Sequence, residues 1–531
     1  MKPYLLHQLL DASAERTPDA IALIEPKRTL TYAELAGLSH RIARALVDGG
    51  GASTPTAVRG APVGLWSEKT SAAISAVYGI LRAGAAYVPI DPATPPARAA
   101  QILRKVEARY LVTTADRVEM LYELKRQGEL PSLEHLVLLS KAESLGPELS
   151  LTDGTIERGI LPTVAITDGF LAYVLHTSGS TGKPKGVAIT HRNALAFVEP
   201  ATDHFAITAA DRLACQAPVH FDLSVFDLYC ASLAGAAVVS LPEYFSAFPK
   251  KMAGAVREHG VTIWNSVVSA LGLLVDKGLS GAETLPSLRA VIFSGERMPI
   301  PLLRRVRDRA PNAKLFNVYG QTEANSSLVH EVAEIPADDG AALPLGTALP
   351  NFDVFLLDEQ QRPVTGSDVE GELCVRAATV AAGGYFREPA LTAEKFVVDP
   401  ELPDSCAKTY RTGDVVKRND NGDLVFVGRR DNMIKTRGYR VELSEIEIAL
   451  ESIAGVAEVA VVAVPSQEIG HALHAFIQPA PGASLDAPAI DAVLRSKLPA
   501  YMVPETIAVR EALPRTATGK IDRSLLKAER V

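Results

Sequence analysis

Hydrophobic and polar positions follow two patterns that recur along this chain. Residues 70–82 carry apolar side chains at helical spacing, which predicts a helix. Short apolar runs stand at 86–90, 261–265 and 290–294, and helical stretches separate them from their neighbours. Such runs are typical of buried strands. No segment of 20–50 residues repeats, so the alternation predicts an α/β fold with layers of sheet and helix rather than a solenoid.

The pattern changes after Arg430. The order becomes a helix at 444–453, strands at 456–464 and 472–477, a helix at 487–497 and a strand at 505–509. This is a self-contained α+β unit of about 100 residues. We therefore expect a large N-terminal core of layered α/β subdomains over residues 1–430 and a small C-terminal domain over residues 431–531.

Length and charge narrow the function. The chain has 531 residues, with 54 Lys and Arg against 62 Asp and Glu. This length predicts about three to four folding units with clefts between them. A net charge of −8 without basic runs argues against a nucleic-acid partner, because binding phosphates needs clustered positive charge. We expect a monomer.

Location is predicted from what the sequence lacks. It has no leader-like apolar start and no apolar run near the roughly 20 residues that span a bilayer, so we expect no membrane partner. Cys215, Cys230, Cys374 and Cys406 are scattered and form no metal-binding spacing. A reducing compartment, the cytoplasm, is therefore expected.

A glycine- and hydroxyl-rich stretch carries the strongest chemical signal. Residues 177–186 follow an apolar strand and, apart from Pro184, consist of Gly, Ser, Thr and Lys, which suit a polyphosphate. The spacing is not that of a P-loop, because only two residues separate Gly179 from Gly182 and Pro184 stands where a helix would begin. The alternative is a flexible surface turn. The expected phosphate contacts are Thr177, Ser178, Gly179, Ser180, Thr181, Gly182, Lys183 and Lys185.

This stretch and seven ordered motifs together resemble the adenylate-forming enzymes, which include acyl-CoA synthetases, luciferases and the adenylation domains of nonribosomal peptide synthetases. The resemblance covers nearly the whole chain and is closest to a stand-alone amino-acid adenylation enzyme. The motifs are residues 30–35, 81–91, 317–323, 371–374, 410–414, 428–431 and 514–520.

The resemblance implies a two-step ligase that uses ATP and Mg²⁺. A carboxylate attacks the α-phosphate to give an acyl-adenylate and pyrophosphate, and a thiol then takes the acyl group. By resemblance, Lys520 is the catalytic lysine that bridges substrate carboxylate, ribose and α-phosphate. Thr322 contacts the α-phosphate and Glu323 holds Mg²⁺, for which a carboxylate oxygen is a suitable ligand. The alternative for Lys520 is an ordinary exposed lysine.

Further roles follow from the same motifs. Asp414 accepts the ribose hydroxyls, with Arg429 as a second ribose or phosphate contact. Either could instead form a surface ion pair. Tyr319 stacks on adenine, and Asn317 and Val318 from the same motif are also expected to bind ATP. In the C-terminal domain, Asp431 is the hinge, and a face near Lys435 and Gly438 serves thiol transfer after the domain rotates.

The substrate is predicted from an acidic residue in an apolar stretch. Asp222 resembles the residue that pairs with a substrate α-ammonium, and a buried carboxylate needs such a cation. The alternative is a helix N-cap. The other expected pocket residues carry no charge, which predicts a small neutral amino acid: alanine first, with glycine, serine and cysteine also allowed. They are Leu223, Phe226, Asn265, Ile292, Ser294, Gly295, Val318, Ser326 and Ser327.

The acceptor is expected to be a separate molecule. Eleven residues follow Lys520 and none resembles a phosphopantetheine attachment site. A discrete carrier protein in antibiotic or other natural-product biosynthesis is expected, with coenzyme A as the competing acceptor. The alternatives are an acyl- or aryl-CoA synthetase, which Gln321 favours and Asp222 disfavours, and a nucleotide-binding protein without catalysis.

Overall fold

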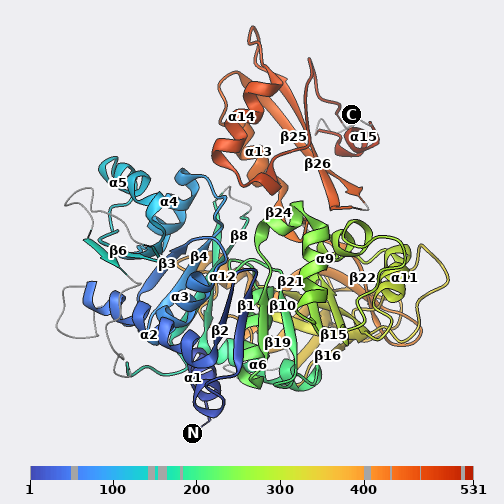
Figure 1. Cartoon of the computed structure of the whole chain (residues 1–531). Helices are drawn as coiled ribbons and strands as arrows, with labels where there is room; N and C mark the ends of the chain where they lie inside the picture. Colours follow the sequence, from blue (N-terminus) through green and yellow to red (C-terminus); the bar gives the residue numbers. More distant parts are fainter. Residues whose placement is uncertain are drawn as a thin grey trace.

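The computed structural model describes residues 2–49, 58–140, 150–153, 164–179, 183–399, 408–430, 433–466, 468–515 and 521–529. A smaller lobe containing α13, α14, β25 and β26 stands on a larger body that holds the N-terminus (Figure 1).

A nine-stranded sheet forms one half of the larger body. Its inner strands pair in parallel from β1 through β11, β10, β12 and β13 to β14, and antiparallel strands finish both edges. In spatial order the strands are β16 (Thr347–Ala348), β15 (Asn325–Glu331), β14 (Lys314–Gln321), β13 (Ala290–Ser294), β12 (Ile263–Val267), β10 (Arg212–Cys215), β11 (Ala237–Ser240), β1 (Ile21–Glu25) and β2 (Arg28–Thr31).

A seven-stranded sheet forms the other half. It is parallel except for the edge pair β8–β9, which is an antiparallel hairpin. The expected phosphate loop connects these two strands, so a strand and not a helix follows it. In spatial order the strands are β7 (Ser150–Asp153), β6 (His135–Leu138), β5 (Tyr110–Thr113), β3 (Pro62–Trp66), β4 (Ala86–Ile90), β8 (Leu171–Thr177) and β9 (Lys185–Thr190).

Helices cover both faces of each sheet. Side chains alternate along a strand, so Leu213 packs into the core between the sheets while Ala214 packs into the core on the outer face. The body is therefore layered as helix, sheet, helix, sheet, helix. The inner helices are α1 (Leu6–Arg16), α2 (Tyr32–Gly49), α3 (Ser71–Arg82), α6 (His191–His204) and α8 (Ala231–Ala234); the outer ones are α4 (Pro96–Lys105), α5 (Val118–Arg126), α9 (Pro249–Glu258), α10 (Val268–Gly272) and α11 (Ile300–Arg309).

A third sheet follows, in which each described strand pair is antiparallel. Its strands are β17 (Phe352–Leu357), β18 (Pro363–Val364), β19 (Glu370–Ala377), β20 (Phe396–Val398), β21 (Lys408–Arg418) and β22 (Leu424–Arg429), with α12 (Pro389–Lys395) beside it. Beyond it come the hairpin β23 (Met433–Thr436) and β24 (Tyr439–Glu442), then α13 (Leu443–Glu451), β25 (Val456–Ser466), β26 (Gly470–Pro479), α14 (Ala487–Lys497), β27 (Thr506–Val509) and α15 (Arg523–Ala528).

The α/β prediction is confirmed. The expected helix over 70–82 is α3, and Thr70 caps it by accepting a hydrogen bond from the backbone N–H of Ala73. The strands expected at 86–90 and 290–294 and the helix at 487–497 have the predicted bounds. Among the described residues, no helix combines the length and apolar character needed to cross a membrane.

Candidate active site

A cavity of about 110 Å³ lies at the carboxyl end of the nine-stranded sheet, where parallel strands commonly place ligands. The hairpin β23–β24 closes it from the smaller lobe. Fourteen predicted residues line it: Thr177, Ser178, Asp222, Leu223, Phe226, Asn265, Ile292, Ser294, Gly295, Val318, Thr322, Ser326, Lys435 and Gly438.

Asp222 is the acidic group of this cavity. Its carboxylate accepts a hydrogen bond from the Thr322 hydroxyl at 2.7 Å and forms no ion pair within the described part of the chain. Burial raises the pKa of Asp222 above its usual value, and the Thr322 hydrogen bond and the charge of Lys435 only partly offset this. Although Asp222 precedes α7 (Leu223–Val225), its side chain caps no backbone N–H there. Capping of α7 therefore does not account for this carboxylate.

Hydrogen bonds to Asp227 and Leu223 hold the side chain of Asn265 in place. Its side-chain amide N–H group donates to the carboxyl Oδ1 of Asp227 at 3.1 Å and to the carbonyl of Leu223 at 3.5 Å. Burial raises the pKa of Asp227 to about 8. The amide nitrogen is therefore engaged by two acceptors, and Asn265 itself lines the cavity. No local pattern predicts that Asn265 and Asp227 are partners, because they are 38 positions apart.

Asp414 marks the other end of the site. It accepts hydrogen bonds on Oδ2 from the Tyr319 hydroxyl at 2.5 Å and from the Gln321 amide at 2.8 Å, and on Oδ1 it pairs with Arg429. The three donors hold the carboxylate at one orientation. Gln321, considered in the sequence only as a residue that favours a CoA synthetase, is thus a structural partner of the expected ribose-binding residue.

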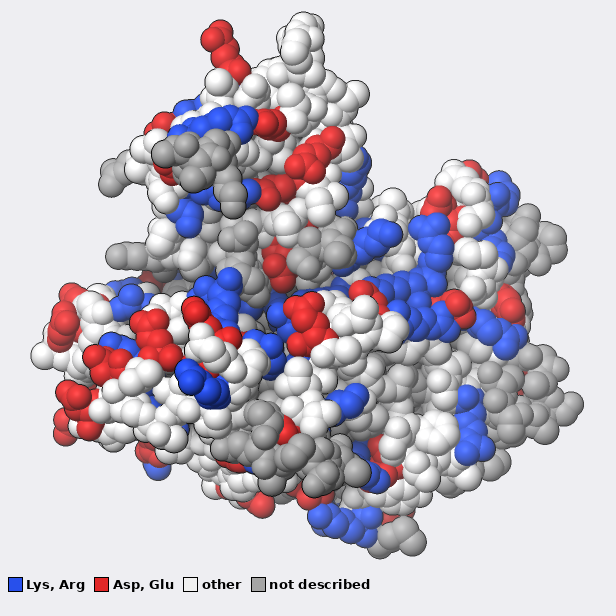
Figure 2. Space-filling model, turned by 180° about the vertical axis from the view of Figure 1, so that it is seen from behind, with Lys and Arg blue, Asp and Glu red and all other residues white. Residues whose placement is uncertain are grey.

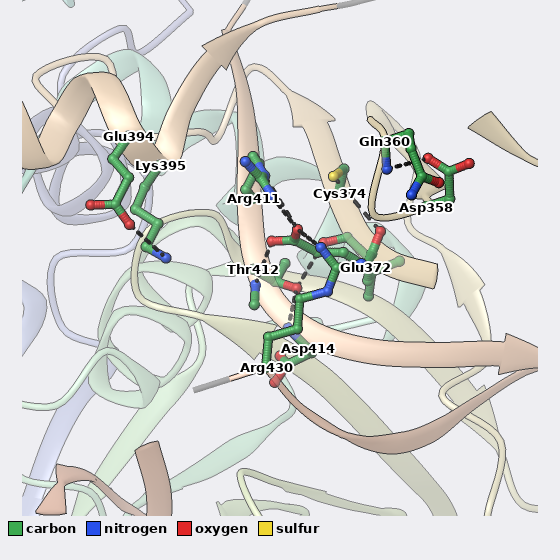
Figure 3. Close-up of polar contacts among 12 residues, drawn as sticks. Asp358, Gln360, Glu372, Cys374, Glu394, Lys395, Arg411, Thr412, Asp414 and Arg430 are labelled. Atoms are coloured by element: carbon green, nitrogen blue, oxygen red, sulfur yellow. Dashed lines mark hydrogen bonds and ion pairs between the residues drawn. The ribbon is translucent and has the colours of Figure 1, made fainter. Parts of the chain in front are cut away.

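Glu372 supports this end and was not predicted as a site residue. It is almost fully buried in β19, and Figure 3 shows Arg411 and Arg430 converging on it. Its carboxylate pairs with Arg411 at 2.5 Å and with Arg430 at 3.2 Å, and it accepts the backbone N–H of Gly413 at 3.1 Å. It therefore ties the strand that carries Asp414 to the residue just before the expected hinge.

Glu323 is completely buried. Its Oε1 accepts hydrogen bonds from the Tyr385 hydroxyl at 2.7 Å and from Arg440 at 2.9 Å, while Oε2 has no hydrogen-bond partner among the described residues. Burial alone would raise the pKa of Glu323, but the charges of Arg440 and Lys185 outweigh it and lower the pKa to about 2. An ionised carboxylate with one open oxygen fits a divalent cation that also binds substrate phosphates.

Several predicted residues lie elsewhere. Ser327 does not line the cavity: neighbouring side chains of β15 point to opposite faces, and its buried hydroxyl donates to the carbonyl of Tyr319 at 3.5 Å. The Asn317 amide donates to the carbonyl of Pro344. Gly179, Lys183 and Lys185 belong to the β8–β9 connection and its edges, outside the cavity wall. Ser180, Thr181, Gly182, Asp431 and Lys520 lie outside the described residues.

The expected thiol-transfer face points into the cavity. Lys435 and Gly438 both line it, and burial lowers the pKa of Lys435. Gly438 has φ +79°, and an added Cβ there would lie 2.3 Å from a methyl carbon of Val267. Its backbone N–H donates to Glu296 at 2.8 Å. Only glycine allows this close approach of the hairpin to the core.

These features together are those of a ligase that forms acyl-adenylates, and comparison with known proteins agrees. The family model "AMP-binding enzyme" matches residues 10–386, and the model "AMP-binding enzyme C-terminal domain" matches residues 445–520. The chain therefore belongs to the AMP-binding enzyme family and is an adenylate-forming ligase that uses ATP.

Three similar proteins show how far the similarity of this chain to known proteins extends. The chain is 34% identical to an L-proline–[L-prolyl-carrier protein] ligase of Pseudomonas fluorescens, with 98% of each chain covered. It is 35% identical to phosphinothricin tripeptide synthetase PhsC of Streptomyces viridochromogenes over 98% of this chain but only 45% of that protein. The structure of amide bond synthetase McbA from Marinactinospora thermotolerans shares the fold, with 24% identity, 99% coverage of both chains and a TM-score of 0.84.

Proposed function

We propose that this enzyme activates a small neutral amino acid as an aminoacyl-adenylate and transfers it to the phosphopantetheine thiol of a separate carrier protein. The observation that carries the proposal is Asp222, a partly buried carboxylate on the cavity wall that accepts a hydrogen bond from the Thr322 hydroxyl and forms no ion pair within the described chain. A substrate α-ammonium would supply that missing charge. An acyl- or aryl-CoA synthetase would leave it unpaired.

Glu323 would hold Mg²⁺, which when bound neutralises phosphate charge during displacement. Asp414, held by Tyr319 and Arg429, would accept the ribose hydroxyls. Lys520 would neutralise the developing charge at the α-phosphate. Figure 2 shows Lys and Arg side chains gathered on the larger body just below the smaller lobe, a charge distribution that would attract an anionic nucleotide. Motion at Asp431 would exchange Lys520 for the face of Lys435 and Gly438 between the two steps.

The residues that line the cavity limit which amino-acid side chains it can hold. Leu223 and Phe226 are bulky and leave room for a small side chain, as alanine would require. Asn265, however, lines the cavity with its amide nitrogen already engaged, so its carbonyl oxygen would be an acceptor that alanine leaves unused. A serine or cysteine side chain could donate to it, and a buried acceptor left without a donor lowers affinity. Within the small neutral class, serine and cysteine are therefore favoured over alanine and glycine.

L-Proline is a second candidate. The P. fluorescens relative is named for it and covers the same length. The apolar wall of Leu223, Phe226, Ile292 and Val318 suits a pyrrolidine ring. Proline also carries the ammonium that Asp222 requires.

ATP–pyrophosphate exchange over a substrate panel tests the proposal. The panel holds alanine, glycine, serine, cysteine, valine, proline, a fatty acid and benzoate. We expect exchange with serine, cysteine or another small neutral amino acid. Exchange confined to the fatty or aromatic acid would overturn the proposal in favour of a CoA synthetase, and exchange with none would favour a non-catalytic protein. Holo-carrier protein against coenzyme A as the acceptor tests the second step.

A further inference from the structure

His220 lines the cavity, two positions before Asp222, and the proposed mechanism gives it no role. Its side chain is only 12% exposed, and neither ring nitrogen has a hydrogen-bond partner among the described residues. Burying such an imidazole is costly, because each ring nitrogen gives up a hydrogen bond to water. This cost points to a group that enters the cavity and meets the ring.

Asp91, just after β4, gives His220 an acidic neighbour. Its Oδ2 lies 3.8 Å from Nε2 of His220, while its Oδ1 accepts the backbone N–H of Ala93 at 2.8 Å. Burial lowers the pKa of His220, and the charge of Asp91 only partly offsets this. The imidazole is therefore neutral near neutral pH and can accept a proton. A carboxylate that faces one ring nitrogen leaves the other nitrogen for a substrate.

A buried lysine holds the backbone that leads to His220. The ammonium of Lys69 is 4% exposed and donates to the carbonyls of residues 215, 216 and 217 at 2.6, 2.9 and 3.0 Å. A lysine ammonium has three donors, so these bonds use all of them. The larger body therefore fixes the segment before His220 without help from the smaller lobe.

The smaller lobe brings its hairpin to the same ring. The ring of Tyr439 lies at 21° to that of His220, with the two centroids 6.5 Å apart, and it stacks on Tyr501 at 3.9 Å. Both tyrosines line the cavity together with Gly438, which belongs to the expected thiol-transfer face. A thiol that arrives on this face reaches a cavity whose wall on the body includes His220.

We propose that His220 is the general base of thiol transfer and that Asp91 is its positioning residue. The imidazole accepts the proton of the acceptor thiol while the sulfur attacks the carbonyl carbon of the aminoacyl-adenylate. The C–S bond forms, the C–O bond to the phosphate breaks, and AMP leaves with the electron pair of that bond. Asp91 stabilises the imidazolium, which then loses its proton to water. This inference rests on the proposed two-step function.

The acidity of the thiol shows whether a base takes part, because only the thiolate attacks. Enzyme loaded with aminoacyl-adenylate is mixed with pantetheine, mercaptoethanol or the more acidic trifluoroethanethiol, and the release of AMP is followed. At about pH 8, trifluoroethanethiol is largely ionised, whereas the other two thiols are largely protonated. His220→Gln should slow AMP release about 10²-fold with the two protonated thiols but stay within about threefold of wild type with trifluoroethanethiol. Equal slowing with all three thiols, or no slowing, would overturn the proposal.

Two further variants separate proton transfer from packing. Asp91→Asn keeps the size of the side chain and should slow AMP release about tenfold with the protonated thiols only, while pyrophosphate exchange in both this variant and His220→Gln stays within about threefold of wild type. His176→Gln is the matched control, because His176 also lines the cavity with two unpartnered ring nitrogens but pairs with no carboxylate within the described chain. It should change the rates with all three thiols by the same factor. A wild type that transfers the aminoacyl group to none of the thiols would instead refute the proposed function.

Discussion

The amino-acid end and the phosphate end of the site are built differently. The amino-acid end is built mainly on one sheet. Asn265, Ile292 and Val318 lie on neighbouring strands of the nine-stranded sheet, and the carboxylate of Asp222 lines the same cavity. The phosphate end is shared between the body and the smaller lobe through ion pairs such as Arg98–Glu445 and Glu323–Arg440. We therefore expect selectivity for the amino acid to depend on the fixed cavity wall of the nine-stranded sheet. We expect the change between the two half-reactions to depend on the ion pairs between the body and the smaller lobe, which can break and re-form.

The largest effect should fall on the phosphate end. Lys520→Ala should lower amino-acid-dependent pyrophosphate exchange by about 10²–10³-fold, because one preorganised charge at the α-phosphate is lost. Release of AMP from a supplied aminoacyl-adenylate by pantetheine should stay near wild type. Lys527→Ala, on the exposed surface of α15, is the control. If Lys520→Ala slowed both half-reactions equally, the proposal that Lys520 acts only in adenylate formation would be wrong.

The hairpin contact should affect the second step alone. In Gly438→Ala the new methyl group meets Val267, so thiol transfer should fall about tenfold or more while adenylation is retained. Gly482→Ala is a matched control, because Gly482 has the same φ of +79° in open space. Rates of AMP release with pantetheine and of pyrophosphate exchange measure the two steps. Loss of pyrophosphate exchange in Gly438→Ala would show that the contact is not specific to thiol transfer.

A smaller effect on catalysis is expected from Gln321, which lines the amino-acid cavity and contacts Asp414. Gln321→Ala removes one of three donors to Asp414, so the KM for ATP should rise about three- to tenfold. The KM for the amino acid should not change. Steady-state kinetics with each substrate varied in turn measures both, and a rise confined to the amino-acid KM would contradict the ribose assignment.

The smallest expected effect is a difference in pH dependence between the KM for the amino acid and the KM for ATP. Burial raises the pKa of Asp222, and only the carboxylate form pairs with an ammonium, so the KM for the amino acid should fall as the pH rises from the usual aspartate range of about 4 towards neutral. The pKa of Glu323, about 2, leaves it ionised throughout, so the KM for ATP should lack this trend. Parallel curves for both substrates would contradict the assignment.

Local patterns predicted most of the fold. The strands at 86–90 and 290–294 stand out because every residue in them is buried. The motifs singled out Asp222, which lies on the cavity wall, while the roles of Glu323 and Asp414 stay predictions. Partnerships across the chain were not predictable, because they carry no local pattern: Arg98 and Glu445 are 347 positions apart. Ser327 was misplaced because the face that a strand residue takes depends on its register.

The most direct test of the account pairs each amino acid with its analogue lacking the α-amino group: alanine with propionate, serine with 3-hydroxypropionate and cysteine with 3-mercaptopropionate. Pyrophosphate exchange is measured for the wild type and for Asp222→Ala. The account predicts that the wild type prefers the amino acid by about 10–100-fold in kcat/KM and that Asp222→Ala loses this preference. An unchanged preference for the amino acid in Asp222→Ala would contradict it.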